Sequence, residues 1–183
     1  MCKPEKATVD QVCEVAAQIK SGRINRWNLQ AFILDPDSVL RSQIYEVVVD
    51  YDQPLAKMIE ACKLDWVNED ITEEHFPIQG NGHKKVKLEL YQFDKTITGD
   101  QALKRLDEAG YRPATIEELL VFGKKYPDKQ RQFPIIALAS SWCNPGGHLY
   151  VPSLYGDAAG RYLSLSWPGL DFDPHYRFLV VGK

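Results

Sequence analysis

The pattern of apolar and polar residues is most regular in the second half of the chain. Residues 84–93 alternate charged with apolar side chains, which predicts a strand with one face in solvent. Capping boxes that begin at Thr98 and at Thr115 then predict the starts of two helices. The segments that follow are rich in apolar residues and are predicted to be strands. These segments are 133–141, 148–151, 161–167 and 176–181.

Three of these elements also predict which side chains face the core. In the first helix, Ala102, Leu103 and Leu106 recur at helical spacing and are expected to point inward. The segment 133–141 has apolar residues at both parities, which is typical of a central strand covered on both faces. The segment 161–167 alternates, so its leucines are expected on the buried face. The residues that this places on the opposite face are Tyr162, Ser164 and Ser166.

The first half of the chain has shorter and less regular segments. A capping box at Thr8, followed by apolar residues at helical spacing, predicts a helix that ends near Gly22. A second short helix is expected over residues 25–34, before a proline. The β-branched run at 45–51 predicts a strand, and the apolar spacing over 55–62 predicts a helix.

The clearest linker in the chain is Gln79-Gly80-Asn81-Gly82, because it combines turn residues without apolar anchors. We therefore predict a smaller α/β N-terminal region over residues 1–78 and a compact domain over residues 84–183. The fold class is α+β, with the second domain running as one strand, two helices and then antiparallel strands.

This order of elements resembles the C-type-lectin-like fold, in which the first and last strands pair at one edge. The segment YRPATIEEL at 111–119 is similar to the R-x-x-T-x-x-E pattern with which bacterial members begin their second helix. Residues 44–183 resemble an uncharacterised family of bacterial proteins, which carries no established activity. The segments that carry this resemblance are VVVDY at 47–51, DWVNEDITEEHFP at 65–77, YRPATIEELLVFG at 111–123, QRQFPIIALASSW at 130–142 and RFLVV at 177–181.

Bacterial lectin-like domains include the variable proteins of diversity-generating retroelements, which bind ligands through their last strands and loops. The resemblance therefore implies a binding surface in the corresponding part of this chain. The chain departs from lectins in two respects, and both limit the kind of ligand that the resemblance implies. Cys143 is alone in this half, so the disulfides of vertebrate lectins are absent, and the calcium and sugar motifs EPN, QPD and WND are absent too. We expect neither calcium-dependent sugar binding nor a cofactor.

The bulk composition describes an ordinary globular protein. Hydrophobic residues make up 44% and charged residues 26%, and the formal net charge is −3. This charge gives no general attraction to nucleic acid or to an anionic membrane, and no apolar run is long enough to span a bilayer. Four cysteines without CxxC spacing are expected to be free thiols, and no secretory leader is visible, so we expect a soluble cytoplasmic protein.

The last 45 residues differ from the rest in composition. From Ala139 onward there is no Glu, the only Lys is Lys183, and six of the twelve glycines occur there. Tyr, Trp, Ser, Gly and Asn are enriched in recognition surfaces because they give contact area and hydrogen bonds at low entropic cost. We expect non-catalytic recognition of a protein or another macromolecule. The expected contact residues are Trp142, Asn144, His148, Tyr150, Tyr155, Arg161, Tyr162, Ser164, Ser166, Trp167, Asp171, Asp173, His175 and Tyr176. A twisted sheet with aromatic core residues and glycine turns accounts for part of the same composition.

A small enzyme or a metal-binding protein is the alternative. Cys143 and His148 have the chemistry of a thiol nucleophile and its base, although the surrounding Cys-Asn-Pro-Gly-Gly is typical of a loop. Asp171, Asp173 and His175 would share one face of an extended segment and offer metal ligands. The same aspartates are equally typical of turns, in which Asp accepts hydrogen bonds from the local backbone.

Overall fold

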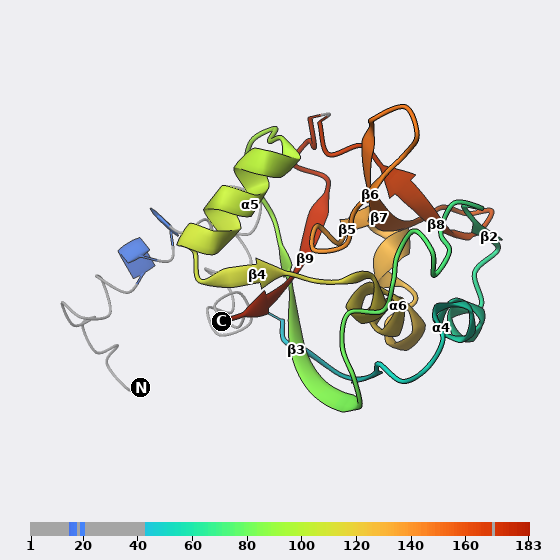
Figure 1. Ribbon diagram of the computed structural model, residues 1–183. Coiled ribbons are helices and arrows are strands. Elements are labelled where there is room, and N and C mark those ends of the chain that lie inside the picture. The colour runs from blue at the N-terminus through green and yellow to red at the C-terminus, as the bar shows by residue number, and fades with distance from the viewer. Residues whose placement is uncertain (1–14, 18, 21–42, 170) are drawn as a thin grey trace, which may run out of the picture. The chain divides into compact units, whose positions relative to one another are not determined.

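The computed structural model describes residues 15–17, 19–20, 43–169 and 171–183. The chain divides into two compact units, Met1–Ser42 and Gln43–Lys183. Residues 15–17 and 19–20 are helical, within the first predicted helix. The capping box at Thr8 and the predicted helix at 25–34 lie outside the described residues. The second unit carries all the features that follow (Figure 1).

The second unit is built around one twisted sheet of nine strands. Their order is β1-β3-β9-β5-β7-β8-β2, with β4 paired to β9 and β6 paired to β7. The strands are β1 (Tyr45–Asp50), β2 (Trp66–Val67), β3 (His83–Tyr91), β4 (Tyr111–Pro113), β5 (Ile135–Ile136), β6 (Trp142–Cys143), β7 (Leu149–Gly156), β8 (Arg161–Ser166) and β9 (Arg177–Gly182). The helices of this unit are α4 (Leu55–Cys62), α5 (Gly99–Glu108), α6 (Ile116–Lys125) and the short 3-10 helix η1 (Lys129–Arg131). The mixed α+β class is as the sequence predicts.

The expected boundary between residues 78 and 84 lies inside this unit. β1 and β3 pair as antiparallel neighbours along the whole of β1, from Tyr45 opposite Leu88 to Asp50 opposite His83. Gly82 has a φ of 65°, a left-handed conformation that favours glycine. The Gly-Asn-Gly segment is therefore a connection within one unit, because the residues that make a flexible linker also make a tight turn.

The sheet has a hydrophobic cluster on each face, as the strand alternation predicts. On one face, α4 and α6 pack their apolar residues against Ile135, Leu154 and Leu163, all fully buried. On the other face, α5 contributes Ala102 and Leu106 to a second cluster. The members of that cluster on the central strands include Ile136, Val151, Phe178 and Val180. Adjacent residues of β5 thus belong to opposite clusters, which confirms that this strand is covered on both faces.

The sequence predicts the start of α5 correctly, but it predicts the wrong burial for one of the side chains of this helix. Thr98 and Gln101 form the predicted capping box of α5. Ala102 and Leu106 are fully buried, but Leu103 is 38% exposed rather than inward. Each helical residue turns by about 100°, so Leu103 lies on the flank of the narrow stripe formed by its neighbours at i and i+4.

The second half of the chain contains more strands than predicted. β4 lies between the two helices, and β6 precedes β7, so five strands follow the helices instead of four. The predicted strand over 133–141 is reduced to β5, because the chain turns after Ile136 and Ala139 donates its N–H to the carbonyl of Ala114 (3.1 Å). The pairing of β3 with β9 joins the first and last strands of the predicted domain.

The R-x-x-T-x-x-E segment forms an ion pair between the half-buried Arg112 and the buried Glu118. Arg112 donates two hydrogen bonds to the carboxylate of Glu118, at 2.9 and 2.6 Å, and Glu118 is fully buried. The same carboxylate accepts the backbone N–H of Thr115 at 2.9 Å and the hydroxyl of Tyr51 at 3.4 Å. The hydrogen bond to Glu118 raises the pKa of Arg112. These residues therefore join β4 to the start of α6, and their role is structural.

Within the described residues, no helix combines the length and the apolar character needed to cross a membrane.

Candidate recognition surface

Among the helices that the structure describes, none covers one part of the sheet on the face that α5 covers elsewhere. In Figure 1, α5 lies toward the opposite end of the sheet from β8 and β2. Leu163 is fully buried in the other face, so the alternation of β8 directs Tyr162, Ser164 and Ser166 to the uncovered face. All three are half-buried, as the sequence predicts for side chains that point away from the leucines.

Three aromatic residues lie side by side across this uncovered face, on three neighbouring strands. Tyr162 of β8 is opposite Tyr155 of β7 and, on its other side, opposite Trp66 of β2. The rings of Tyr155 and Tyr162 are 4.9 Å apart between centroids. Trp66 is 47% exposed and Tyr155 is 37% exposed, so these rings present an apolar surface to solvent. We call Trp66, Tyr162 and Tyr155 the aromatic row.

Serine residues continue the same face beside the aromatic row. Ser166 donates a hydrogen bond to Ser153 Oγ at 3.0 Å, and Ser153 donates to the carbonyl of Ser164 at 3.4 Å. Ser153 lies directly opposite Ser164 and is buried. The half-buried Ser164 and Ser166 therefore form a polar strip next to the aromatic rings, and both are hydrogen-bonded to the buried Ser153.

The β7–β8 connection holds Tyr162 in place. The hydroxyl of Tyr162 donates a hydrogen bond to Asp157 Oδ1, in this connection, at 3.1 Å. The same oxygen accepts the backbone N–H groups of Ala159 and Gly160, at 2.8 and 3.0 Å, and these bonds lower the pKa of Asp157. The pKa of Tyr162 is raised, first by desolvation and then by the bond to Asp157. These hydrogen bonds restrict the position of the Tyr162 ring.

Other predicted contact residues form two smaller aromatic groups. The ring of Trp142 stacks on His75, with centroids 4.2 Å apart, and lies 6.0 Å from Tyr150. The second group is an edge-to-face pair of His148 and Trp167, with centroids 6.2 Å apart. Trp142 and Tyr150 are half-buried, and Trp167 is 44% exposed.

Arg161 belongs to the packing of the unit rather than to its surface. Its guanidinium donates to the carbonyls of Cys62 and Gly123, at 3.0 and 2.8 Å, and to Gln130 Oε1 at 3.1 Å. Its backbone N–H donates to Asp65 Oδ2 at 2.8 Å. Because these bonds tie α4, α6 and β8 together, we leave Arg161 out of the recognition surface.

The remaining predicted residues have local roles or lie at turns. Asn144 Oδ1 accepts the N–H of His148 at 2.9 Å, which closes the β6–β7 turn. Asp173 Oδ1 accepts the N–H of His175 at 2.7 Å, so the turn interpretation of this aspartate is confirmed. Tyr176 packs against Phe172, with ring centroids 5.2 Å apart. Asp171 and His175 are exposed.

Sequence reasoning missed Trp66, which belongs to this surface, and Ser153, the buried residue to which the surface serines are hydrogen-bonded. Trp66 lies in a two-residue strand whose parallel partner, β8, comes far later in the chain. No local periodicity marks such a short strand. Ser153 lies in a predominantly buried stretch of β7, and only the register with β8 reveals its serine partners.

The structure does not join the residues of the catalytic alternative. Cys143 is exposed, and its Sγ lies 3.7 Å from the carbonyl oxygen of Asn144. Among the described residues, no hydrogen bond links it to His148, whose ring packs on Trp167 instead. Asp171, Asp173 and His175 do not form a metal-binding cluster within the described ranges.

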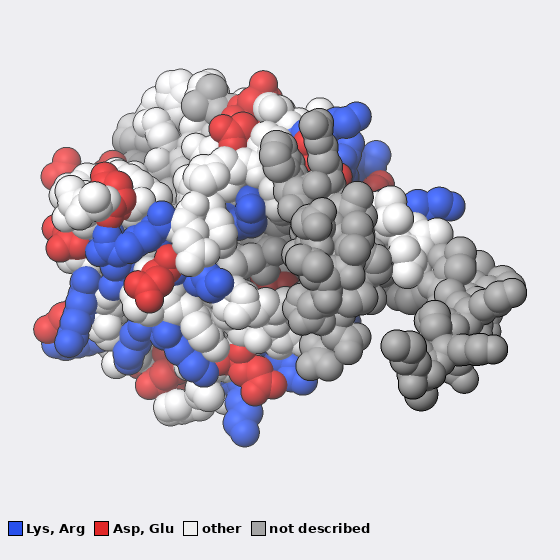
Figure 2. All heavy atoms as spheres, turned by 180° about the vertical axis from the view of Figure 1, so that it is seen from behind, with Lys and Arg blue, Asp and Glu red and all other residues white. Residues whose placement is uncertain are grey.

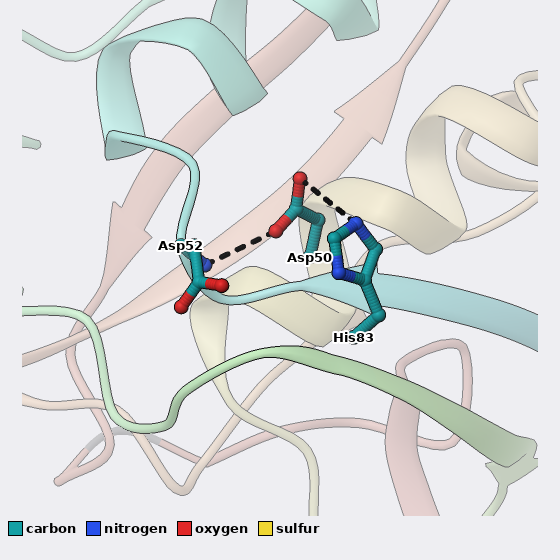
Figure 3. Close-up of side chains that lie close together, drawn as sticks. All are labelled: Asp50, Asp52 and His83. Carbon is teal, nitrogen blue, oxygen red and sulfur yellow. Dashed lines mark hydrogen bonds and ion pairs between the residues drawn. The ribbon is translucent and has the colours of Figure 1, made fainter.

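A different group, at the β1–β3 connection, brings metal-binding side chains together. One ligand atom from each of Asp50, Asp52 and His83 lies within 4.8 Å of the others (Figure 3). His83 Nε2 is 3.4 Å from Asp50 Oδ2. Asp50 Oδ1 accepts the N–H of Asp52 at 3.1 Å, and Asp52 Oδ1 accepts the N–H of Gly82 at 2.8 Å. These bonds account for the arrangement as a hydrogen-bonded turn, so we assign it no metal.

The surface charge agrees with the bulk composition. On the face seen in Figure 2, Lys and Arg side chains are interspersed with Asp and Glu over the described surface. A nucleic-acid interface requires a continuous basic field, and this face does not show one. Comparison of the chain with protein-family models, with curated proteins and with solved structures gives no match.

Proposed function

We propose that the unit Gln43–Lys183 is a non-catalytic recognition domain with a C-type-lectin-like fold, and that it binds a protein ligand through its last strands. The observation that carries this proposal is the aromatic row, Trp66, Tyr162 and Tyr155, which crosses three strands and is not covered by any of the described helices. Exposed, rigid aromatic rings flanked by hydroxyl groups are typical of protein-binding surfaces.

The order and pairing of the strands support the lectin-like part of the proposal. β3 and β9, the first and last strands of the predicted domain, are neighbours, and both helices of that domain lie between them in sequence. A role comparable to the variable proteins of retroelements follows from the position of the surface, on β7, β8 and the loops beside them.

The free surface also differs chemically from the rest of the unit. Two carboxylates, Asp157 and the exposed Asp65, lie beside the aromatic row, and both already accept hydrogen bonds from backbone N–H groups. The guanidinium of Arg161 is engaged inward, by the carbonyls of Cys62 and Gly123. A ligand that covers Tyr162 and Ser164 would therefore desolvate few charged groups. This favours binding, because the desolvation of charges is the largest free-energy penalty at an interface.

The test compares two double variants of the full chain. The first, Trp66→Ala with Tyr155→Ala, removes the two exposed rings of the aromatic row. The control, Val48→Ala with Leu103→Ala, removes exposed apolar side chains from β1 and α5, where Val48 is 53% and Leu103 is 38% exposed. A protein captured by the wild-type chain is identified, purified and titrated against each variant by calorimetry.

We expect the first variant to bind the captured protein at least tenfold more weakly, with a melting temperature within a few degrees of wild type, whereas the control keeps wild-type affinity. Aromatic anchors typically contribute more than about 1.4 kcal/mol each at an interface, which is a factor of ten. Equal affinity of both variants would remove the aromatic row as the binding surface. A large loss of melting temperature in the first variant would make the rings part of the core instead.

A further inference from the structure

A second hollow, separate from the aromatic row, lies where β9 ends. It has a volume of about 800 Å³ and is bounded by the first half of β3 on one side and by the segment from β4 into α6 on the other. β9 pairs with β3 only from Leu88 to Tyr91, so in the described part of the chain the first half of β3 has β1 alone as a strand neighbour. The hollow occupies the place where the sheet is interrupted.

The charged side chains that line this hollow are mainly basic. Five are cationic and two are anionic, which gives a formal charge of +3 in a chain whose formal net charge is −3. We call this hollow the cationic cavity. Its charged lining residues are Lys84, Lys85, Lys87, Glu89, Arg112, Glu118 and Lys183.

The two carboxylates of the lining are already occupied. Glu118 is fully buried and accepts both hydrogen bonds of the Arg112 fork, at 2.9 and 2.6 Å. Glu89 accepts the hydroxyl of Tyr111 at 3.1 Å. Neither carboxylate is close enough to a lysine of the cavity to form an ion pair within the described residues. The positive charge of the lysines is therefore not neutralised by the cavity itself.

Three of the four lysines make weak surface contacts with other described residues. Lys84 Nζ lies 5.3 Å from the centroid of the Tyr51 ring. Lys87 is 3.9 Å from Glu46, in a pair of which both side chains are more than two-thirds exposed, and Lys183 pairs with the exposed Asp107. Exposed pairs of this kind contribute little, so an incoming anion can replace them.

We propose that the cationic cavity binds a small organic anion that carries two or three negative charges as carboxylate or phosphate groups. The volume lies in the range of small-molecule sites, and the formal charge of +3 matches an anion of that valence. Lysine ammonium groups on flexible stems converge on such anions as point charges, without the fixed geometry that an arginine fork requires. This binding is independent of the aromatic row and of any protein ligand.

Calorimetric titration of the full chain at low ionic strength tests this proposal, with pyrophosphate and citrate as separate probes and acetate as the monovalent control. The variant Lys84→Gln with Lys85→Gln removes two cavity charges. Lys57→Gln with Lys104→Gln is the matched control, because it removes the same charge from exposed lysines outside the cavity.

We expect a divalent or trivalent probe to bind, the cavity variant to bind it at least tenfold more weakly, and the control variant to bind as wild type does. Binding of pyrophosphate alone assigns a phosphate ligand, and binding of citrate alone assigns a carboxylate ligand. The affinity should fall as salt is raised, since the Debye length shrinks from about 30 Å at 0.01 M to about 8 Å at 0.15 M. Absence of binding by both probes, equal binding of acetate, or equal loss in the two variants overturns the proposal.

Discussion

The two ends of one sheet face show how the same strand alternation produces either a core or a surface. A single row of neighbouring residues crosses from one end to the other: Phe178 of β9, Ile136 of β5, Ser153 of β7 and Ser164 of β8. Phe178 and Ile136 belong to the cluster that α5 joins, and they are almost fully buried. Ser164 is half-buried and lies on the uncovered part of the face.

The covering helix, and not the strand, therefore decides whether this face becomes core or surface. Where α5 is present, large apolar side chains fill the space under it. Where none of the described helices lies over the strands, small hydroxyl side chains and the exposed aromatic row take their place. The change occurs between β7 and β8: Val151 and Ser153 of β7 are still buried, whereas their partners on β8, Ser166 and Ser164, are half-buried.

The largest expected effect is at the covered end. Phe178→Ala would leave a cavity among Phe93 and Phe172, whose ring centroids lie 5.2 and 5.4 Å from that of Phe178. Such truncations lower the free energy of unfolding by about 3–5 kcal/mol. Denaturant unfolding of this variant beside Tyr155→Ala, which should lower it by less than about 1 kcal/mol, measures the contrast directly. Similar losses in both variants would contradict the division of the face.

An intermediate effect is expected at Arg161, which lies at the open end but whose side chain is directed inward. Arg161→Ala would leave the carbonyls of Cys62 and Gly123 without their donor, so the free energy of unfolding should fall by about 2–3 kcal/mol. Arg105→Ala, an exposed arginine of α5, is the matched control and should change stability by less than about 0.5 kcal/mol. If Arg161→Ala is as stable as the wild type, Arg161 does not stabilise the packing and belongs again among the candidate surface residues.

These cases show which parts of the molecule could be predicted from the sequence. The helix starts at Thr98 and Thr115 depend on residues three positions apart, so their signals are complete within a few residues. The outward face of β8 follows from alternation within one strand. Local signals of this kind gave the order of most elements in the second unit and the side of the sheet on which Tyr162 lies.

The features that were missed depend on distant pairings. The sequence shows an arginine at the start of a strand, but not the carbonyls that Cys62 and Gly123 bring to it. The role of Trp66 appears only when β2 pairs with β8. The Gly-Asn-Gly segment has the same composition in a linker and in a tight connection, and only the pairing of β1 with β3 distinguishes the two.

The smallest expected effect is a difference in thiol reactivity between a buried and an exposed cysteine. Cys62, the last residue of α4, is buried, and its thiol donates to the carbonyls of Leu120 and Met58 at 3.0 and 3.3 Å. Cys143 is exposed on β6. Burial raises the pKa of Cys62 to about 11. Only about one thiol in a thousand is then a thiolate at pH 8, and the thiolate is the form that alkylating reagents attack.

We therefore expect iodoacetamide at pH 8 to label Cys143 quickly and Cys62 only after unfolding, as resolved by mass spectrometry of the separate peptides.

The raised pKa of Cys62 also makes the free energy of unfolding depend on pH. The unfolded chain releases the thiol proton above its ordinary pKa of 9, whereas the folded chain holds it to about 11. The stability contributed by the protonated thiol is therefore complete below pH 9 and is lost as the pH rises toward 11. Cys62→Ala should reduce this loss of stability at high pH. Equal labelling of Cys62 and Cys143 in the folded chain would show that Cys62 is not part of the core.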